Sequence, residues 1–470
     1  MRRAAVPLLA LTVGVVLADS AIVTLALPEI LRHLGGSVAQ VAWVLIAFNL
    51  VLALVVVPAA WACERRPAPL GAAGIAVFAL ASAACALAGS MQVLIAARCV
   101  QALGGAFALV ACLELLVAAQ GEQRGVARWI AAGVIGTAAG PVAGGLLTEA
   151  ISWQSIFVVQ VPVAVLAVPA ALSIRTSPVR SADRHRPAIA PNLALALLSA
   201  ALTAALFLVV LLLVEGWGRS PAAAALSVSV VPLAAFAAPA LARAVRSGPR
   251  SETAAGALLV AGGLVGLALL PSANLAWTIA PQALVGLGLG LTVDSLTFAA
   301  LRDRFPRALH GGWTIGARHA GVVLGLAILT PVFTADLREA QAPAQEAITA
   351  LVLDAGLPAA QKIALAQGLG DQLAQERGRV PDLHPAFADL ELEPEQRPIA
   401  EQLERDLDSQ LERAATQAFR NSFLIGAALA LAALIPLIPF RRAAPAPAGP
   451  VADDDPEPTE DPLAQTQAVR

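Results

Sequence analysis

The chain has 470 residues, of which 58 % are hydrophobic and 14 % are charged, and its net charge at neutral pH is −2. An ordinary soluble domain carries about 25 % charged residues, so this composition excludes that class and favours a membrane protein. The small net charge combines basic loops with an acidic segment, 336–419, so it indicates no affinity for nucleic acid.

Long apolar stretches recur along the whole chain. Each is close to the ~20 residues that a helix needs to cross the hydrocarbon core of a bilayer. The sequence therefore predicts twelve transmembrane helices, at approximately 6–27, 41–62, 70–89, 92–118, 129–151, 156–174, 189–214, 222–245, 253–271, 276–301, 312–335 and 421–440.

Arginines gather in every second connection between these stretches. Positive residues are retained on the cytoplasmic side. The pattern predicts a multi-pass protein of the cell (inner) membrane with an even number of spans and both termini in the cytoplasm. Asp19 interrupts the region where a signal peptide would be cleaved, so we expect the first stretch to remain as a helix. The arginines assigned to the cytoplasmic side are Arg2, Arg3, Arg65, Arg66, Arg124, Arg128, Arg175, Arg180, Arg184, Arg186, Arg243, Arg246, Arg250, Arg302, Arg304, Arg307, Arg441 and Arg442.

The order of the spans predicts an all-α integral membrane protein built from two six-helix bundles with a central cavity between them. A substrate path between two such halves is common in transporters. The segments that we expect are an N-terminal half, 1–180, a cytoplasmic linker, 181–191, a C-terminal half, 192–335 and 420–442, an extracytoplasmic acidic insertion, 336–419, and a disordered cytoplasmic tail, 443–470.

The acidic insertion contains one amphipathic pattern. Ile399, Leu403, Leu407 and Leu411 recur every four residues among charged residues, which predicts a helix that leads into the last span. Two roles stay open for the insertion, a folded cap on the outer surface or a docking site for a periplasmic partner. Its histidine and acidic residues fit no metal-ligand spacing, so no metal site is predicted.

Charged residues inside the spans are rare, and an intramembrane ionisable group indicates a functional site. Asp19 lies eight residues before Leu27, ~12 Å below the outer face, and Arg98 lies ~9 Å below the same face. Asp294 and Arg318 both lie ~10 Å above the inner face, on neighbouring spans. The depths predict two intramembrane charge pairs.

Two interpretations of these pairs remain open. Burial disfavours the charged form of a carboxyl group, and a nearby guanidinium favours it. A site that balances the two effects can exchange a proton as water access changes, which would give Asp19 and Asp294 proton-coupling roles. In the other interpretation, both pairs only stabilise the fold. His319 is either a group that titrates near neutral pH or a hydrogen-bonded neighbour.

The fifth span carries regularly spaced glycines. Gly136, Gly140 and Gly144 fall on one helix face, which lets another helix approach closely. Pro141 removes a backbone donor and bends the helix, and Gly145 follows the last glycine of the row.

Several motifs together resemble the major facilitator superfamily, specifically its drug:proton antiporters. The run Gly136 to Gly145 matches the group's antiporter signature, Gly-x-x-x-Gly-Pro-x-x-Gly-Gly, at every fixed position. The stretch from Asp19 to Pro28 is similar to the family's first-span motif. The stretch from Arg98 through Gln101 and Gly104 is similar to the fourth-span motif. The sixth span begins in a similar way but has glutamines at 154 and 160 where Arg and Asn are usual, and Arg318 and His319 stand in a similar late-span motif.

The resemblance implies a major-facilitator-type fold in which Asp19 and Arg98 couple protons and the glycines of the fifth span shape a contact that favours export. The chain departs from the family in the loop between the second and third spans. There Ala59, Cys63 and Arg66 replace a glycine, an aspartate and a glycine, and Glu64 stands one residue out of register. In the family this loop latches the inner gate by charge pairing, so the resemblance implies altered gating kinetics in this chain.

We therefore expect a proton-coupled exporter of small amphipathic compounds or drugs that works by alternating access. The proton gradient would supply the energy. We expect no cofactor and no binding to nucleic acid. A dedicated exporter of one endogenous metabolite or antibiotic, and a non-transporting membrane receptor or scaffold, are the alternatives. The sequence contains no recognisable nucleophile–base pair and no phosphate-binding loop, so we do not expect an enzyme. The sequence does not indicate the substrate, the proton stoichiometry or the oligomeric state.

Overall fold

Twelve helices in the described part of the chain are long and apolar enough to cross a membrane. The computed structural model describes residues 2–176, 185–245, 249–302, 304–375, 383–388, 390 and 393–438. Within these ranges the regular structure is entirely helical, so the predicted all-helical fold with twelve spans is confirmed. The predicted tail, 443–470, and residues 181–184 of the predicted linker lie outside the described residues.

The N-terminal half contains six spans, the last of them assembled from two helices. Serine caps begin two of these helices, because Ser37 Oγ and Ser90 Oγ accept hydrogen bonds from backbone N–H groups in the first turns. The helices are α1 (Arg2–Leu34), α2 (Val38–Cys63), α3 (Pro67–Ala86), α4 (Met91–Gln120), α5 (Glu122–Ala150), α6 (Ser155–Val158) and α7 (Gln160–Leu172).

The C-terminal half is less regular. Its first span contains two π-helical segments, a feature that is common at functional sites. Its second span is interrupted at Ser229. The helices of this half are α8 (Ile189–Thr203), η1 (Ala204–Leu208), α9 (Val209–Leu211), η2 (Leu212–Gly216), α10 (Pro221–Val228), α11 (Val230–Val245), α12 (Pro249–Ala268), α13 (Leu275–Leu301), α14 (Arg307–Asp354) and α18 (Arg420–Ala432), which is followed by η3 (Ile435–Leu437).

Helix α14 continues far beyond the apolar stretch predicted at 312–335. It has 48 residues and runs unbroken through residue 336, where the acidic insertion was expected to begin. Hydropathy detects only the part of a helix that crosses lipid, whereas the residues that follow are polar but good helix formers. The helix ends before Gly356 and Pro358, which are typical stop signals.

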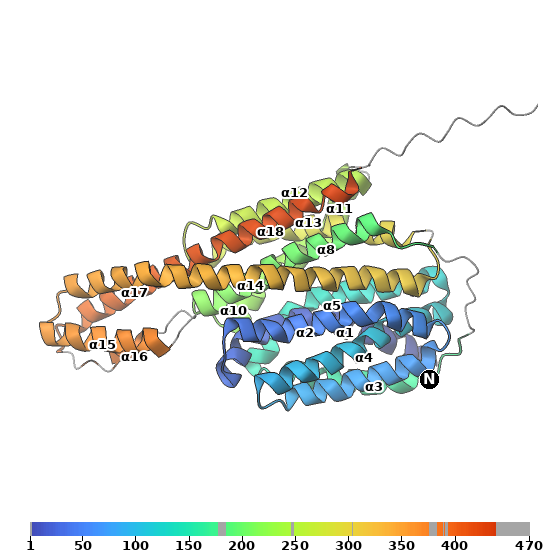
Figure 1. Cartoon of the computed structure of the whole chain (residues 1–470), viewed down its shortest axis with the longest axis horizontal. Coiled ribbons are helices and arrows are strands. Elements are labelled where there is room, and N and C mark those ends of the chain that lie inside the picture. The colour runs from blue at the N-terminus through green and yellow to red at the C-terminus, as the bar shows by residue number, and fades with distance from the viewer. Residues whose placement is uncertain are drawn as a thin grey trace, which may run out of the picture. The chain divides into compact units, whose positions relative to one another are not determined.

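The insertion has its own small hydrophobic core, and its helices lie beside the C-terminal part of α14 (Figure 1). Helices α15 (Ala359–Gln375), α16 (His384–Ala388) and α17 (Arg397–Ala418) gather around the extension of α14. The predicted amphipathic helix is present as α17, but its buried face begins at Ala400 and continues through Leu403, Leu407 and Leu411. Ile399 is 38 % exposed, so its place in the predicted row is wrong. The drift of a 3.6-residue helix from a strict four-residue repeat accounts for this.

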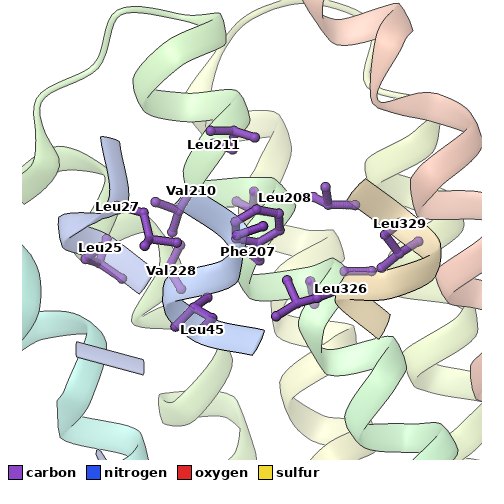
Figure 2. Packing of buried hydrophobic residues seen from close by; sticks show 14 of the residues in the cluster. Leu25, Leu27, Leu45, Phe207, Leu208, Val210, Leu211, Val228, Leu326 and Leu329 are labelled. Atoms are coloured by element: carbon purple, nitrogen blue, oxygen red, sulfur yellow. The ribbon is translucent and has the colours of Figure 1, made fainter. Parts of the chain in front are cut away.

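The two halves pack against each other through a continuous apolar cluster (Figure 2). Leu25 and Leu27 of α1 and Leu45 of α2 belong to the same cluster as Phe207 of η1 and Val228 of α10. On one side of the interface α2 packs along α14, and on the other α5 packs against α10. These contacts hold residues through Leu437 in one compact unit.

Helices α1 and α5 approach each other through glycines. A methyl group added at Gly136 would lie 2.1 Å from the carbonyl oxygen of Gly14, and one at Gly144 would lie 2.4 Å from the carbonyl oxygen of Ile22. Backbone cannot yield to such contacts without a shift of the whole helix. The row of small residues in the fifth span therefore sets the distance between α1 and α5.

Gly136→Ala should lower the apparent unfolding temperature of the detergent-purified protein, because overpacking a tight contact costs about 1–3 kcal/mol. Gly262→Ala is the matched control, since a methyl group there meets nothing within 4 Å. Equal unfolding temperatures for the two variants would contradict the close approach of α1 and α5.

Candidate functional site

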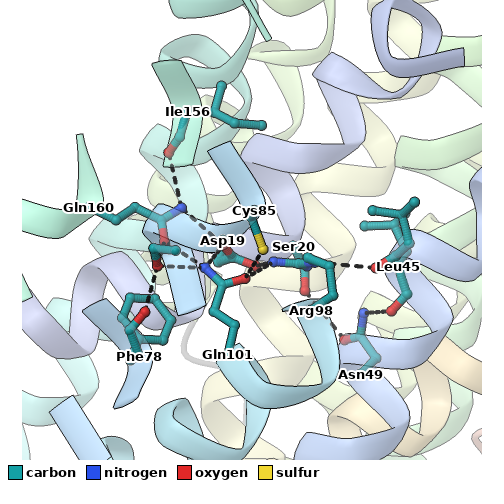
Figure 3. Close-up of polar contacts among 12 residues, drawn as sticks. Asp19, Ser20, Leu45, Asn49, Phe78, Cys85, Arg98, Gln101, Ile156 and Gln160 are labelled. Carbon is teal, nitrogen blue, oxygen red and sulfur yellow. Dashed lines mark hydrogen bonds and ion pairs between the residues drawn. The ribbon is translucent and has the colours of Figure 1, made fainter. Parts of the chain in front are cut away.

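Asp19 lies in the interior of the N-terminal half, with none of its surface exposed (Figure 3). Arg98 of α4 is equally buried and forms an ion pair with it, from Arg98 Nη1 to Asp19 Oδ2. A charge in a medium of low polarity is costly unless it is paired and hydrogen-bonded. The structure thus brings together the acid and the base that sequence depth places at the same level.

Two glutamines complete the surroundings of the carboxylate. Gln160 Nε2 of α7 donates to Asp19 Oδ1 at 2.9 Å, and Gln101 Nε2 of α4 approaches the same oxygen at 3.3 Å. Gln101 also accepts a hydrogen bond from Arg98 Nη1 at 2.6 Å. Both carboxylate oxygens are therefore hydrogen-bonded by side chains from other helices.

A second layer of polar contacts fixes the glutamines. Gln101 Nε2 lies 2.9 Å from Ser82 Oγ and 3.0 Å from Gln160 Oε1. Ser82 Oγ lies 2.8 Å from the carbonyl oxygen of Phe78, to which it donates. An amide nitrogen has two hydrogens, so Gln101 shares them among three acceptors. Helices α1, α3, α4 and α7 each supply one or more members of this cluster.

Arg98 has partners besides Asp19. Its Nε donates to the carbonyl oxygen of Val44 at 3.3 Å, and its guanidinium carbon lies 4.1 Å from the centre of the Phe48 ring. A cation over an aromatic face is stabilised by the ring quadrupole. Arg98 Nη2 has no acceptor among the described residues. The guanidinium can therefore keep several contacts if the ion pair is broken.

A cavity of about 100 Å³ lies between the two halves. Its lining combines apolar side chains such as Leu17 and Phe207 with the hydroxyl groups of Ser20, Thr137 and Thr203. Asp19 is not part of this lining, because its carboxylate points into the N-terminal half. The acid and the cavity are thus neighbouring but separate sites.

One hydrogen bond beside the cavity joins the two halves. His319 Nδ1 of α14 lies 2.6 Å from Asn49 Oδ1 of α2, and both side chains are buried. Asn49 Nδ2 donates to the carbonyl oxygen of Leu45 at 2.8 Å, so its Oδ1 is an acceptor and the histidine nitrogen must donate. Ser20 Oγ also reaches Asn49 Oδ1, at 3.4 Å.

The second predicted charge pair is arranged differently. Arg318 is half-buried and lines the cavity, whereas Asp294 on α13 is exposed. Asp294 acts on Arg318 electrostatically, but in the described chain no hydrogen bond or close ion pair joins the two groups.

The remaining motif residues lie at helix contacts. Pro28 is buried within α1, and Pro141 is buried within α5. Gly104 lies against α3, where an added methyl group would be 2.5 Å from the backbone nitrogen of Phe78. Gly140 faces Ala21 of α1, and Gly145 faces Ala225 of α10 in the other half.

Sequence reasoning did not assign roles to Gln160, Ser82 or Asn49. A signal for them existed, because each is a polar side chain in the interior of an apolar span. Among the described residues no group of three or more His, Cys, Asp and Glu side chains could hold a metal ion.

Two six-helix halves around a cavity, built entirely from membrane-crossing helices in the described ranges, define a multi-pass membrane protein with the architecture of a secondary transporter. The chain belongs to the Major Facilitator Superfamily, whose sequence model matches residues 9–330. Proteins of this family are membrane transporters and not enzymes. The family resemblance read from the motifs is confirmed.

Similar proteins include several that confer drug resistance. The tetracenomycin C resistance and export protein of Streptomyces glaucescens is 38 % identical over 177 residues, 36 % of this chain and 32 % of that protein. The multidrug resistance protein Stp of Mycobacterium tuberculosis is 38 % identical over 157 residues, 32 % of this chain and 29 % of that protein. The methylenomycin A resistance protein of Streptomyces coelicolor is 32 % identical over 243 residues, 49 % of each chain. The chain thus spans between about a third and a half of the length of these relatives.

A solved structure has the same fold. A bacterial homolog of the human lysosomal transporter Spinster, in an inward-facing and occupied conformation, superposes with a TM-score of 0.62. The match covers 93 % of this chain and 97 % of that chain at 17 % sequence identity.

Arg98→Met should destabilise the protein by about 3–5 kcal/mol, because it leaves a buried carboxylate without its cation. The double variant Asp19→Asn/Arg98→Met should recover part of this loss, since it removes both charges. The measurement is thermal unfolding of the purified protein in detergent.

The exposed pair Arg32–Glu29 provides the control. Arg32→Met should change stability by no more than about 1 kcal/mol. If Asp19→Asn/Arg98→Met were as unstable as Arg98→Met alone, the ion pair would not be what stabilises this cluster.

Proposed function

We propose that the protein exports small amphipathic compounds, drugs among them, in exchange for protons. The observation that carries this proposal is the sealed cluster around Asp19 and Arg98 next to a cavity between the two halves. The drug- and antibiotic-resistance relatives support the same class of substrate. In this proposal the protein lies in the inner membrane with both termini in the cytoplasm, as the arginine pattern indicates.

Asp19 is the proposed proton carrier. Protonation neutralises its charge and removes the ion pair with Arg98. The guanidinium then keeps Gln101 Oε1 and the Val44 carbonyl oxygen as acceptors and the Phe48 ring as a cation–π partner. These partners limit the cost of separating the guanidinium from the carboxylate.

Helix α2 connects the proton site to the cavity. The Val44 carbonyl oxygen accepts from Arg98, and about one and a half turns further on Asn49 bonds to His319 across the interface. A change in the Arg98 contacts therefore acts on the same helix that joins the two halves. This gives a physical route by which protonation of Asp19 shifts the balance between inward-facing and outward-facing states.

Coupling requires that proton and substrate favour opposite states. Proton binding from outside would favour one state, and substrate binding from inside would favour the other. Because the chain belongs to a transporter family, a receptor or scaffold role is not favoured. No contact among the described residues favours a dedicated exporter of one metabolite.

Asp19→Asn should abolish proton-driven export while leaving substrate exchange down a gradient intact. The amide keeps the size of the carboxylate but cannot carry the proton. The measurement is dye efflux from proteoliposomes with and without an imposed pH gradient.

Export by the Asp19→Asn variant that still responds to the pH gradient as wild type does would refute the role of Asp19. Gradient-independent exchange at the wild-type rate is the control that the variant folds and binds substrate.

Gly145→Ala should slow transport, because an added methyl group would lie 2.3 Å from Ala225 Cβ and 2.8 Å from the Pro221 carbonyl oxygen of the other half. The halves could then no longer close against each other at this point. Turnover in proteoliposomes measures the effect, and Gly262→Ala serves as the control. Wild-type turnover by Gly145→Ala would show that this contact does not limit the cycle.

A further inference from the structure

The charge inside the central cavity is of one sign. Arg318 is the only lining side chain in the described chain that carries a fixed charge, and no aspartate or glutamate is part of the lining. Asp19 faces away from it, toward Arg98 and Gln160. The other polar lining groups are hydroxyls, the Asn49 amide and His319, none of which carries a negative charge.

A second cavity shows the same arrangement. It is a groove of about 750 Å³ that runs along the packed helices α1 and α5, lined mainly by alanine, glycine and aliphatic side chains. Its one charged lining residue within the described ranges is Arg128, near the N-terminal end of α5. Both spaces therefore combine an apolar wall with a single arginine and present no carboxylate.

We propose that the substrate is an amphipathic organic anion, and that Arg318 binds its acidic group. This inference rests on the proposed export function and specifies its substrate class. A guanidinium binds carboxylate, sulfonate or phenolate oxygens through charge-assisted hydrogen bonds. The leucines and Phe207 of the lining contact the apolar part of the molecule.

An organic cation does not fit the same cavity. It would meet Arg318 in a medium of low polarity, where repulsion between like charges is stronger than in water. No carboxylate in the lining neutralises it. Asp294 acts on Arg318 from α13 but is not among the lining residues, so it offers the substrate no direct partner.

The test uses two dyes that share a xanthene scaffold, anionic fluorescein and cationic rhodamine 6G. Binding of each dye to the full-length protein in detergent is measured by fluorescence polarisation at neutral pH. Wild type should bind fluorescein more tightly than rhodamine 6G. Arg318→Gln should weaken fluorescein binding roughly tenfold or more, because a charge-assisted hydrogen bond is lost. Arg318→Lys should retain most of the affinity, and Arg318→Glu should reverse the preference.

Arg32→Gln is the matched control, since Arg32 lies outside both cavities and should leave fluorescein binding unchanged. Tighter binding of rhodamine 6G by wild type, no measurable binding of fluorescein, or equal affinities in wild type and Arg318→Gln would each overturn the proposal. Equilibrium binding needs no proton gradient, so loss of coupling in Asp19→Asn and loss of anion binding in Arg318→Gln fail independently.

Discussion

The arrangement of the N-terminal half depends on one buried ion pair, Asp19 with Arg98. Neither group reaches solvent, so each charge is compensated only by the other and by neighbouring dipoles. This requirement explains why Gln101, Gln160 and Ser82, from three helices, converge on the same point. A network of this kind favours the helix arrangement that pairs most of its donors and acceptors. It can therefore also respond when one proton changes the pattern of donors and acceptors.

In the proposed mechanism helix α2 transmits such a response, because it touches both sites within one and a half turns. Val44 contacts Arg98, Leu45 lines the cavity and Asn49 bonds to His319. In the other half, two glycines of α14 about one turn apart, Gly312 and Gly316, bring that helix close to α2. Close backbone contact transmits small displacements, because packed interfaces move between discrete arrangements rather than deforming continuously.

The sequence predicts the spans well, since about twenty apolar residues can hardly do anything but cross the bilayer. The depth of each residue along its helix was also enough to predict the Asp19–Arg98 pair. Few charged residues occur inside the spans, so few other pairings were possible. Depth did not reveal Gln160 or Ser82, which are neutral and whose direction depends on helix rotation. Depth alone likewise could not distinguish Arg318, which lines the cavity, from Asp294, which is exposed on α13. The length of α14 was missed because hydropathy stops at the membrane surface, whereas helix propensity does not.

The separation of Asp19 from the cavity lining has a consequence for how such a protein can evolve. In a carrier whose acid directly binds its cargo, any change of cargo also alters the group that harvests the ion gradient. In the proposed function, the side chains that would select the cargo, such as Arg318 and Thr203, are different from the one that would hold the proton. Substitutions in the cavity lining can then change the substrate specificity, while the residues around Asp19 stay the same.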